Sequence, residues 1–254
     1  MRLIIRSLRA RWIVAVLVLA LAGVGGAGVF ALALTQPHPE RYASGVLFGD
    51  AAQNAILSNP VARTYLRDFH TQASFSSCGP SSLLNLLASI GAPIASESTL
   101  FDGKPWDRLS MQTQGMTLDD LADLVAGRHI GAVTLLRDLS YAAFLDHLQH
   151  SNSLDNRYIV NFDRAPIFGV SVGHFSPIGG YDAATDLVAL LDVTPGFGPS
   201  LVPSQLLYAG VRTKDPTTGR ARGLLRISDL AANADQRAGQ GKSAPSPVGP
   251  AHRR

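Results

Sequence analysis

The sequence predicts an α+β fold in which helices come before an antiparallel sheet. Periodic apolar spacing in the first part of the chain predicts three helices, at residues 80–90, 117–127 and 141–149. Short aliphatic and aromatic runs with turn-rich borders then predict four strands, at residues 158–162, 175–181, 187–193 and 224–227. Helices followed by strands are typical of α+β proteins, and 254 residues are enough for one domain with extra material at each end.

The ends of the predicted helices carry residues that cap or stop a helix. Gly91 and the proline two residues later end the first helix. Thr117 offers a hydroxyl cap to the second helix, which has two acids in its first turn and Gly127 at its end. Ser140 can cap the third helix in the same way.

Charge is unevenly distributed along the chain. The formal net charge is +3, but residues 1–34 carry +4 and residues 231–254 carry +3, which leaves −4 for residues 35–230. A domain that binds nucleic acid needs clustered cations on its folded part, so this distribution argues against that function. We expect an extended linker at residues 35–49, a folded domain at residues 50–230, and a disordered tail after it.

A long apolar segment lies near the N-terminus. Residues 12–34 contain no charged side chain and are long enough to cross a bilayer as one helix. Four arginines precede this segment, and by the positive-inside rule they place the rest of the chain outside the cytoplasm. We therefore expect residues 1–34 to anchor a periplasmic domain in the membrane. The alternative is a signal peptide, which would release a secreted domain after cleavage of residues 1–33.

Cys78 is the single cysteine of the chain, so it cannot form an internal disulfide. The surrounding residues, Ser-Ser-Cys-Gly-Pro-Ser, place it at the start of the first predicted helix. The N–H groups and the dipole at a helix N-terminus stabilise a thiolate and so lower the pKa of the thiol. This position favours a nucleophile. A buried cysteine that only packs as a small hydrophobic residue is the alternative.

Three further polar residues are spaced so that they can join Cys78 in one site. The amide of Gln72, six residues upstream, can bind an oxyanion together with the Cys78 backbone N–H, although a solvated loop glutamine would look the same. His174 and Asp192 flank a predicted hairpin turn near residue 183, which places them opposite each other with Cβ atoms about 5 Å apart. Asp192 would then orient the His174 imidazole toward the thiol.

Together these segments resemble the catalytic motifs of phytochelatin synthases. They are Gln-x5-Cys-Gly from Gln72, His-Phe-Ser-Pro-Ile-Gly-Gly-Tyr from His174 and Leu-Asp-Val around Asp192, and the likeness extends over residues 50–230. The resemblance implies a papain-like fold and a glutathione γ-glutamylcysteinyltransferase. Such an enzyme cleaves the Cys–Gly bond of glutathione, holds γ-glutamylcysteine as a thioester on the cysteine, and passes it to water or to a second glutathione.

The resemblance also implies a group of substrate-binding residues. Asp215 and Arg222 would hold the ammonium and the carboxylate of the γ-glutamyl end, and Asn161 and Gly173 would contact the substrate at the same site. The alternative for Asp215 and Arg222 is a solvated ion pair in a surface turn. We expect no tightly bound cofactor and no resident metal, although a heavy-metal ion can enter as a glutathione thiolate complex.

The chain departs from the family pattern in two places. Residues 194–200 carry no charge where the family has a basic stretch rich in Tyr and Pro, and the Cys-rich C-terminal region of plant members is absent from this sequence. We therefore expect hydrolysis of glutathione to outweigh its polymerisation. His147 and His150 could share a metal on one helix face, but a solvated face is the commoner arrangement.

Two other functions remain compatible with the same residues. A papain-like peptidase of the bacteriocin-processing kind also contains Cys-Gly-Pro-Ser and a Gly-His strand. A membrane-tethered binding protein with an idle triad is the second alternative, and the reactivity of Cys78 as a thiolate would separate it from an enzyme. The sequence leaves the oligomeric state open.

Overall fold

The computed structural model describes residues 36–92, 96–102, 109–112 and 115–230. The helices are α2 (Asp50–Ser58), α3 (Pro60–Leu66), α4 (Cys78–Ser89), α6 (Leu118–Ala126), α7 (Tyr141–His150), α8 (Ala165–Phe168) and α9 (Ser204–Val211), with short 3-10 helices η1 (Pro39–Arg41) and η2 (Glu97–Phe101). The strands are β1 (Leu47–Phe48), β2 (Ala132–Leu136), β3 (Arg157–Asp163), β4 (Gly173–Asp182), β5 (Leu187–Asp192), β6 (Gly198–Pro203) and β7 (Gly223–Ser228).

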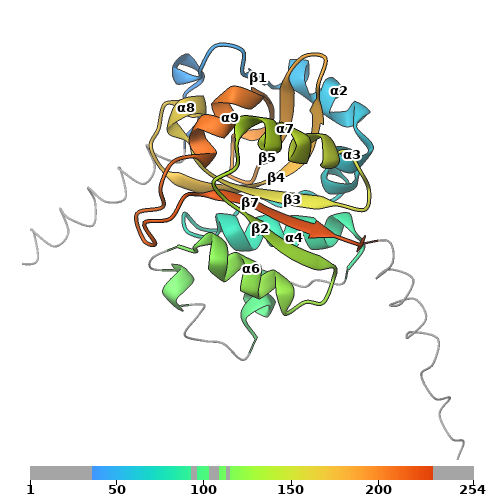
Figure 1. Cartoon of the computed structure of the whole chain (residues 1–254), viewed down its shortest axis with the longest axis vertical. Helices are drawn as coiled ribbons and strands as arrows, with labels where there is room; N and C mark the ends of the chain where they lie inside the picture. Colours follow the sequence, from blue (N-terminus) through green and yellow to red (C-terminus); the bar gives the residue numbers. More distant parts are fainter. Residues whose placement is uncertain (1–35, 93–95, 103–108, 113–114, 231–254) are drawn as a thin grey trace, which may run out of the picture.

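In the described residues, seven strands form one sheet. Their order is β1-β6-β5-β4-β3-β7-β2, and every neighbouring pair is antiparallel. Helices pack on both faces of this sheet (Figure 1). The predicted mixture of helices with an antiparallel sheet is therefore confirmed.

The core consists of two apolar layers, one on each face of the sheet. One layer joins α2, α3, α4 and α6 to strand residues such as Ile159 and Leu191. The other joins α7, α8 and α9 to strand residues such as Val160 and Leu190. Successive side chains of a strand point to opposite faces, so a strand covered on both sides is mostly apolar. The first six residues of β3 are all buried, and the two polar ones among them, Arg157 and Asn161, have hydrogen-bond partners.

The predicted order of helices before strands is wrong. β2 comes before α7, and α8 and α9 lie between later strands. Because the central strands are apolar on both faces, helices from the second half of the chain are needed to cover the second face. The sequence pattern also missed several short elements, namely α2, α3, α8, α9, β1, β2 and β6.

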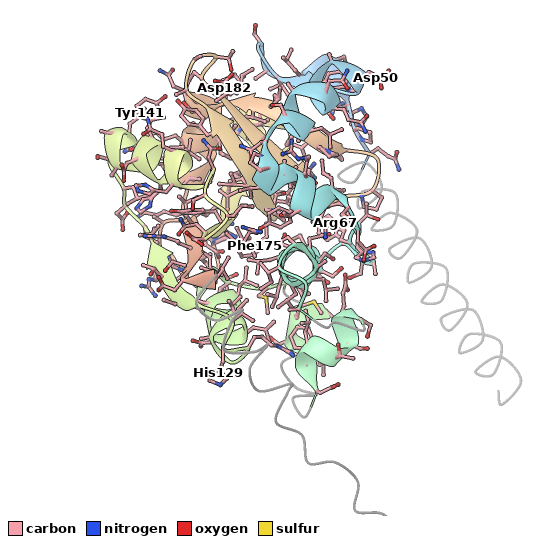
Figure 2. The ribbon with its side chains drawn as sticks, turned by 90° about the vertical axis from the view of Figure 1, so that its right-hand side faces the viewer. Asp50, Arg67, His129, Tyr141, Phe175 and Asp182 are labelled. Atoms are coloured by element: carbon pink, nitrogen blue, oxygen red, sulfur yellow. The ribbon has the colours of Figure 1, made fainter. Side chains whose placement is uncertain are left out.

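Helix α4 lies across one face of the sheet and has the cysteine as its first residue. It begins at Cys78, as the Ser-Ser-Cys-Gly-Pro-Ser run predicts, and nearly all of its residues are buried. The N-cap residue, Ser77, bonds through its hydroxyl to the backbone of Ser74, so the first turn of α4 has no side-chain cap. The absence of a side chain at Gly79 lets Phe175 of β4 approach, and Figure 2 shows Phe175 beside this helix.

The predicted caps of α6 and α7 are present. The Thr117 hydroxyl accepts the backbone N–H of Asp120 at 3.1 Å, and the Asp120 carboxylate accepts the backbone N–H of Thr117 at 2.9 Å. This reciprocal pair is a capping box. The Ser140 hydroxyl accepts the backbone N–H of Ala143 at 3.2 Å.

The β4–β5 hairpin does not have the predicted register. Tyr181 pairs with Val188, so the turn is centred between residues 184 and 185 and not at residue 183. A bulge between Ile178 and Gly180 then shifts the register by one residue. Gly180 has a φ of 140°, and a Cβ atom at this position would lie 2.0 Å from the Asn59 Nδ2 atom. The bulge therefore depends on glycine.

The shifted register changes how His174 meets Asp192. Continuing the pairing of Ile178 with Leu190 places Asp192 opposite Ser176, two residues from His174. His174 is thus a diagonal neighbour of Asp192 on the same face of the sheet, and such neighbours are within reach of long side chains. The predicted contact forms although the predicted register is wrong.

The N-terminal part of the folded domain starts earlier than predicted. The segment expected to be a linker, residues 35–49, contains η1 and β1. Tyr42 packs edge-on against Phe48 and Phe168, with ring centroids 5.2 and 5.0 Å apart. Through Tyr42, Ala43 and Val46, part of the expected linker joins the second apolar layer.

Among the residues that the structure describes, no helix is both long enough and apolar enough to cross a membrane. The predicted anchor at residues 1–34 and the predicted tail at residues 231–254 lie outside the described residues.

Thr117→Ala should lower the free energy of unfolding by about 1 kcal/mol, because the backbone N–H of Asp120 loses its acceptor. Urea unfolding followed by circular dichroism measures this change. Thr71→Ala is the control, since the exposed Thr71 hydroxyl makes no hydrogen bond within the described residues, and its effect should stay below about 0.5 kcal/mol. Equal losses in the two variants would contradict the capping assignment.

Candidate active site

A cleft of about 480 Å³ lies at the N-terminal end of α4. This volume is typical of small-molecule sites. The residues that line it include Ser74, Phe75, Cys78, Met116, Asn161, Gly173, Asp215 and Arg222. Cys78 is half-buried and can be reached from the cleft.

The structure brings Cys78, His174 and Asp192 together. Cys78 begins α4, His174 is the second residue of β4 and Asp192 is the last residue of β5. The His174 Nε2 atom lies 3.1 Å from the Asp192 Oδ1 atom, and both side chains are buried. The His174 imidazole also lies beside the Cys78 thiol, close enough for the two groups to shift each other's pKa. An imidazole held by a carboxylate and facing a thiol is the geometry of an activated nucleophile.

The electrostatics of this group favour a charged pair of sulfur and imidazole. Burial by itself raises the pKa of the Cys78 thiol, but the charge of His174 and its hydrogen bond, with the backbone N–H groups of Phe175 and Gly79, lower that pKa below its ordinary value. Burial by itself lowers the pKa of His174, but the negative charges of Asp192 and Cys78 raise it to about 9. Both shifts favour the charged pair of thiolate and imidazolium over the neutral pair.

Asp192 remains ionised in the interior because two cations face it. Burial alone would raise the pKa of Asp192, but His174 and Arg164 hold it well below its usual range. The stability that His174 contributes is present below the ordinary pKa of histidine and is lost as the pH rises through about 9. The contribution of Asp192 is present above the ordinary pKa of aspartate and is lost only in strong acid.

Arg164 and Thr194 also hold the Asp192 carboxylate, and neither contact was predicted from the sequence. An Arg164 Nη2–H group donates to Asp192 Oδ2 at 3.0 Å, and both groups are buried. The Thr194 backbone N–H donates to Asp192 Oδ1 at 2.8 Å. The Arg164 guanidinium also lies 3.8 Å from the ring centroid of Phe197. The Asp-x-Thr spacing is a turn signal that could have identified Thr194, whereas no local pattern points to Arg164.

Gln72 lies in the loop before α4 and is buried. Its Nε2 atom donates to the backbone carbonyls of Ser74 and Phe75, at 3.0 and 3.4 Å. The Oε1 atom is buried without a hydrogen-bond partner among the described residues. The amide is thus close in sequence and space to the nucleophile loop, but in this state its donors are used within that loop.

The four predicted substrate-binding residues lie together in the cleft. The Arg222 Nη1 atom lies 3.0 Å from the Asn161 Oδ1 atom and 3.5 Å from the Asp215 Oδ2 atom. Gly173 lies under the guanidinium, since a Cβ atom there would be 2.5 Å from the same Nη1 atom. The side chains of Arg222 and Asp215 are only 6% and 13% exposed, so they do not form the solvated surface pair that was the alternative.

His147 and His150 have partners other than a metal in the described part of the chain. His147 Nδ1 lies 3.3 Å from the Tyr158 hydroxyl, and His150 Nδ1 lies 3.4 Å from the Asp146 carboxylate. Burial, the largest effect, lowers the pKa of His147. The pair therefore takes part in ordinary contacts of α7.

Comparisons with known proteins identify relatives over most of this domain. A family model described as phytochelatin synthase matches residues 46–224. A wheat (Triticum aestivum) protein named glutathione gamma-glutamylcysteinyltransferase 1 is 30% identical over 221 residues, which is 80% of this chain and 43% of the relative. A Lotus japonicus protein named glutathione gamma-glutamylcysteinyltransferase 3 is 36% identical over 124 residues, which is 47% of this chain and 26% of the relative. The chain thus spans less than half the length of these relatives.

Replacing His174 with Ala should slow alkylation of Cys78 by iodoacetamide near pH 6 by about tenfold or more, because the buried thiol loses the cation that lowers its pKa. Mass spectrometry of the intact protein gives the rate. His147→Ala is the matched control, since His147 contacts Tyr158 and not the cleft. Equal rates for the wild type and His174→Ala would show that Cys78 is an ordinary thiol.

Proposed function

The chain belongs to the phytochelatin synthase family, and on that premise we propose that it catalyses cysteine-dependent acyl transfer on glutathione. One observation carries the proposal: a single cleft is lined by Cys78, whose thiol has a lowered pKa, and by the largely buried pair Asp215 and Arg222. Cys78 supplies a nucleophile. Asp215 and Arg222 match the ammonium and the carboxylate of an amino-acid group, which are attached to the same carbon. The helix-borne cysteine facing a histidine on an antiparallel sheet supports a papain-like organisation.

In the first step, the Cys78 thiolate attacks the carbonyl carbon of the Cys–Gly bond. The C–N bond of the tetrahedral intermediate breaks, and the His174 imidazolium gives its proton to the nitrogen of the departing glycine. γ-Glutamylcysteine is then held as a thioester on Cys78. Because the pKa of His174 is raised to about 9, this proton is available at neutral pH.

In the second step, the neutral His174 takes a proton from the attacking group. When water attacks, the C–S bond breaks, γ-glutamylcysteine leaves and the Cys78 thiolate is restored. When the amine of a second glutathione attacks, the same step forms a peptide bond and gives a phytochelatin. Asp192 acts by orienting the imidazole and stabilising its charge in both steps.

The backbone N–H of Cys78 and the amide of Gln72 are the proposed oxyanion donors. A donor aimed at the developing negative charge is commonly worth about 10²-fold or more in rate. In this proposal the Gln72 Nε2 group turns from the carbonyls of Ser74 and Phe75 toward the reacting oxygen. The short loop that joins Gln72 to Cys78 supports the assignment, because it keeps the amide next to the nucleophile.

The substrate's γ-glutamyl end is proposed to bind at Asp215 and Arg222. Its ammonium would lie on the Asp215 carboxylate and its carboxylate on the Arg222 guanidinium, with Asn161 and Gly173 fixing the position of Arg222. Such charged hydrogen bonds fix the substrate's orientation as well as adding affinity. The scissile bond would then lie toward Cys78.

Water is the proposed main acceptor. Among the described residues that line the cleft, only Asp215 and Arg222 carry formal charges of their own, which matches one amino-acid head group. The uncharged stretch at residues 194–200 uses Thr194 and Phe197 to support Arg164 and Asp192. A second glutathione therefore has few charged partners. A heavy-metal ion, where present, is proposed to enter as part of a glutathione thiolate complex.

The location of the enzyme is a separate proposal. Residues 12–34 are uncharged, long enough to cross a bilayer, and preceded by arginines, which supports a periplasmic domain tethered to the membrane or, after cleavage, a secreted one.

Brief exposure to glutathione should leave a γ-glutamylcysteinyl adduct on the wild-type protein and none on Cys78→Ser. Mass spectrometry of the intact protein detects the adduct, and chromatography of the supernatant should show γ-glutamylcysteine in excess over longer γ-glutamylcysteine polymers. Absence of an adduct and of glycine release, together with cleavage of an unrelated peptide, would instead identify a peptidase. A predominance of polymers would overturn water as the main acceptor.

Gly173→Ala should raise the KM for glutathione by about tenfold or more, because the new Cβ atom displaces the Arg222 guanidinium. Steady-state kinetics measures KM, and the alkylation rate of Cys78 should stay unchanged. Gly127→Ala is the matched control, since a Cβ atom there meets its neighbours at 3.6 Å or more and Gly127 lies at the end of α6. An unchanged KM in Gly173→Ala would argue against this substrate subsite.

A further inference from the structure

The two charged residues of the proposed substrate subsite lie on one hairpin, residues 213–222, which we call the binding hairpin. Lys214 pairs with Ala221 in an antiparallel bridge, and the backbone N–H of Asp215 donates to the Arg220 carbonyl at 2.9 Å. Gly219 forms the tight turn with a φ of 67°. Asp215 and Arg222 lie on the two strands of this hairpin. A movement of the hairpin would therefore move both residues together.

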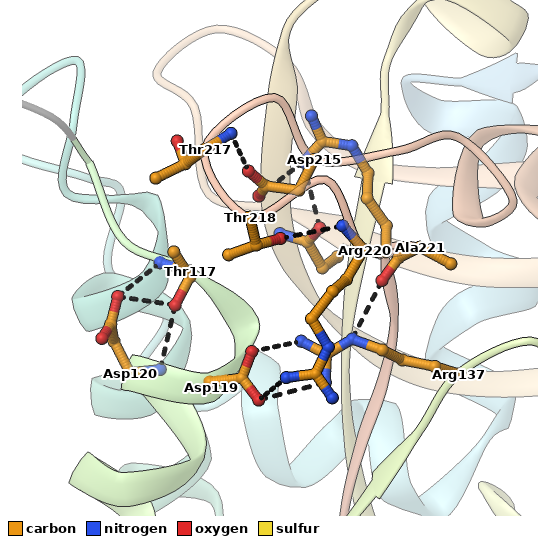
Figure 3. Close-up of polar contacts among 11 residues, drawn as sticks. Thr117, Asp119, Asp120, Arg137, Asp215, Thr217, Thr218, Arg220 and Ala221 are labelled. Atoms are coloured by element: carbon orange, nitrogen blue, oxygen red, sulfur yellow. Dashed lines mark hydrogen bonds and ion pairs between the residues drawn. The ribbon is translucent and has the colours of Figure 1, made fainter.

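On its outer side the binding hairpin is held by Asp119, a residue of α6. The Asp119 carboxylate accepts hydrogen bonds from Arg220 Nη1 at 3.1 Å and from Arg137 Nη1 and Nη2 at 3.2 and 2.8 Å. Figure 3 shows this carboxylate facing the guanidinium groups of Arg220 and Arg137. One carboxylate thus pairs with two cations from different segments of the chain.

Arg137, which Asp119 holds, also binds the backbone next to Arg222. Its Nε atom donates to the Ala221 carbonyl at 2.9 Å, as Figure 3 also shows. The stem of Arg137 packs against Gly223, where an added Cβ atom would lie 3.1 Å from the Arg137 Cγ atom. Arg137 is only 11% exposed, so its guanidinium has little freedom to turn elsewhere. Asp119 therefore controls residues 220 and 221, which come directly before Arg222.

Asp119 is itself in a fixed position. It lies in the first turn of α6, directly after the capping box that Thr117 and Asp120 form. The Asp119 carboxylate is therefore presented to the two arginines by a helix and not by a loop.

We propose that Asp119 is a positioning residue for substrate binding: it fixes the binding hairpin so that Asp215 and Arg222 match the amino-acid end of the substrate. This inference rests on the proposed function in glutathione cleavage. Without the carboxylate, Arg137 and Arg220 face each other as unneutralised like charges, and the hairpin moves away from α6. Cys78 and His174 lie on other elements, α4 and β4, so the chemistry of the thiolate is unaffected.

Steady-state kinetics with glutathione on the full chain tests this inference. Asp119→Asn should raise KM by about tenfold, the equivalent of one charged hydrogen bond, with kcat within about twofold of the wild type. Arg220→Gln should raise KM in the same direction, and because Arg220 is 59% exposed this variant is not expected to impair folding. The double variant should cost less than the product of the two single effects, since both remove one contact.

Two variants of neighbouring acids in the same helix are matched controls. Asp120→Asn weakens the capping box and should lower the melting temperature while leaving KM unchanged. Asp123→Asn removes an exposed carboxylate one turn further along α6 and should change neither quantity. Alkylation of Cys78 by iodoacetamide should proceed at the wild-type rate in every variant.

The outcomes separate this inference from the proposed function. A wild-type protein that does not consume glutathione overturns both. Turnover of glutathione with an unchanged KM in Asp119→Asn and Arg220→Gln overturns the positioning role alone. An equal rise of KM in Asp120→Asn would also overturn it, because the effect would then follow the stability of α6 and not the contact with the binding hairpin.

Discussion

The buried carboxylate of Asp192 is the group on which the arrangement of the site depends. It has no exposed surface, and an unpaired carboxylate in such a place would cost several kcal/mol. Two cations and one backbone N–H compensate this cost: His174, Arg164 and Thr194. Because His174 faces the sulfur at the start of α4, the same carboxylate ties two strands and one helix to a common point.

The buried cation Arg222, which lines the same cleft, is also compensated by polar and acidic partners. Arg222 is buried, and it is held by Asn161, Thr213 and Asp215 and by its close approach to Gly173. These partners leave a defined guanidinium in the cleft that also contains the thiol. Cys78 is held at the start of a helix, His174 and Asp192 on strands, and Asp215 and Arg222 on a short hairpin, where side chains are more rigid than on a long loop.

Much of the site could be predicted because its residues lie in distinctive local patterns. The sequence shows a cysteine at a proline-containing helix start, and a strand that begins near a histidine and is followed by a strand that ends at an aspartate. The structure places these residues together. The register of that hairpin could not be predicted, because a bulge at Gly180 shifts it. His174 still contacts Asp192, because a diagonal neighbour on the same face of the sheet is within reach of its side chain. Arg164 was missed because its partner is 28 residues away.

By itself, the sequence determined the main helices, four of the strands and the residue types of the reactive group, since caps, periodicity and short motifs are local properties. Tertiary structure decided how the sheet is ordered, which helices cover its second face, and which cations neutralise the buried acids. It also decided that Asp119 faces Arg220, 101 residues away. Such pairings arise only when distant segments pack together, because burial and charge compensation are properties of the folded chain and leave no periodic pattern in the sequence.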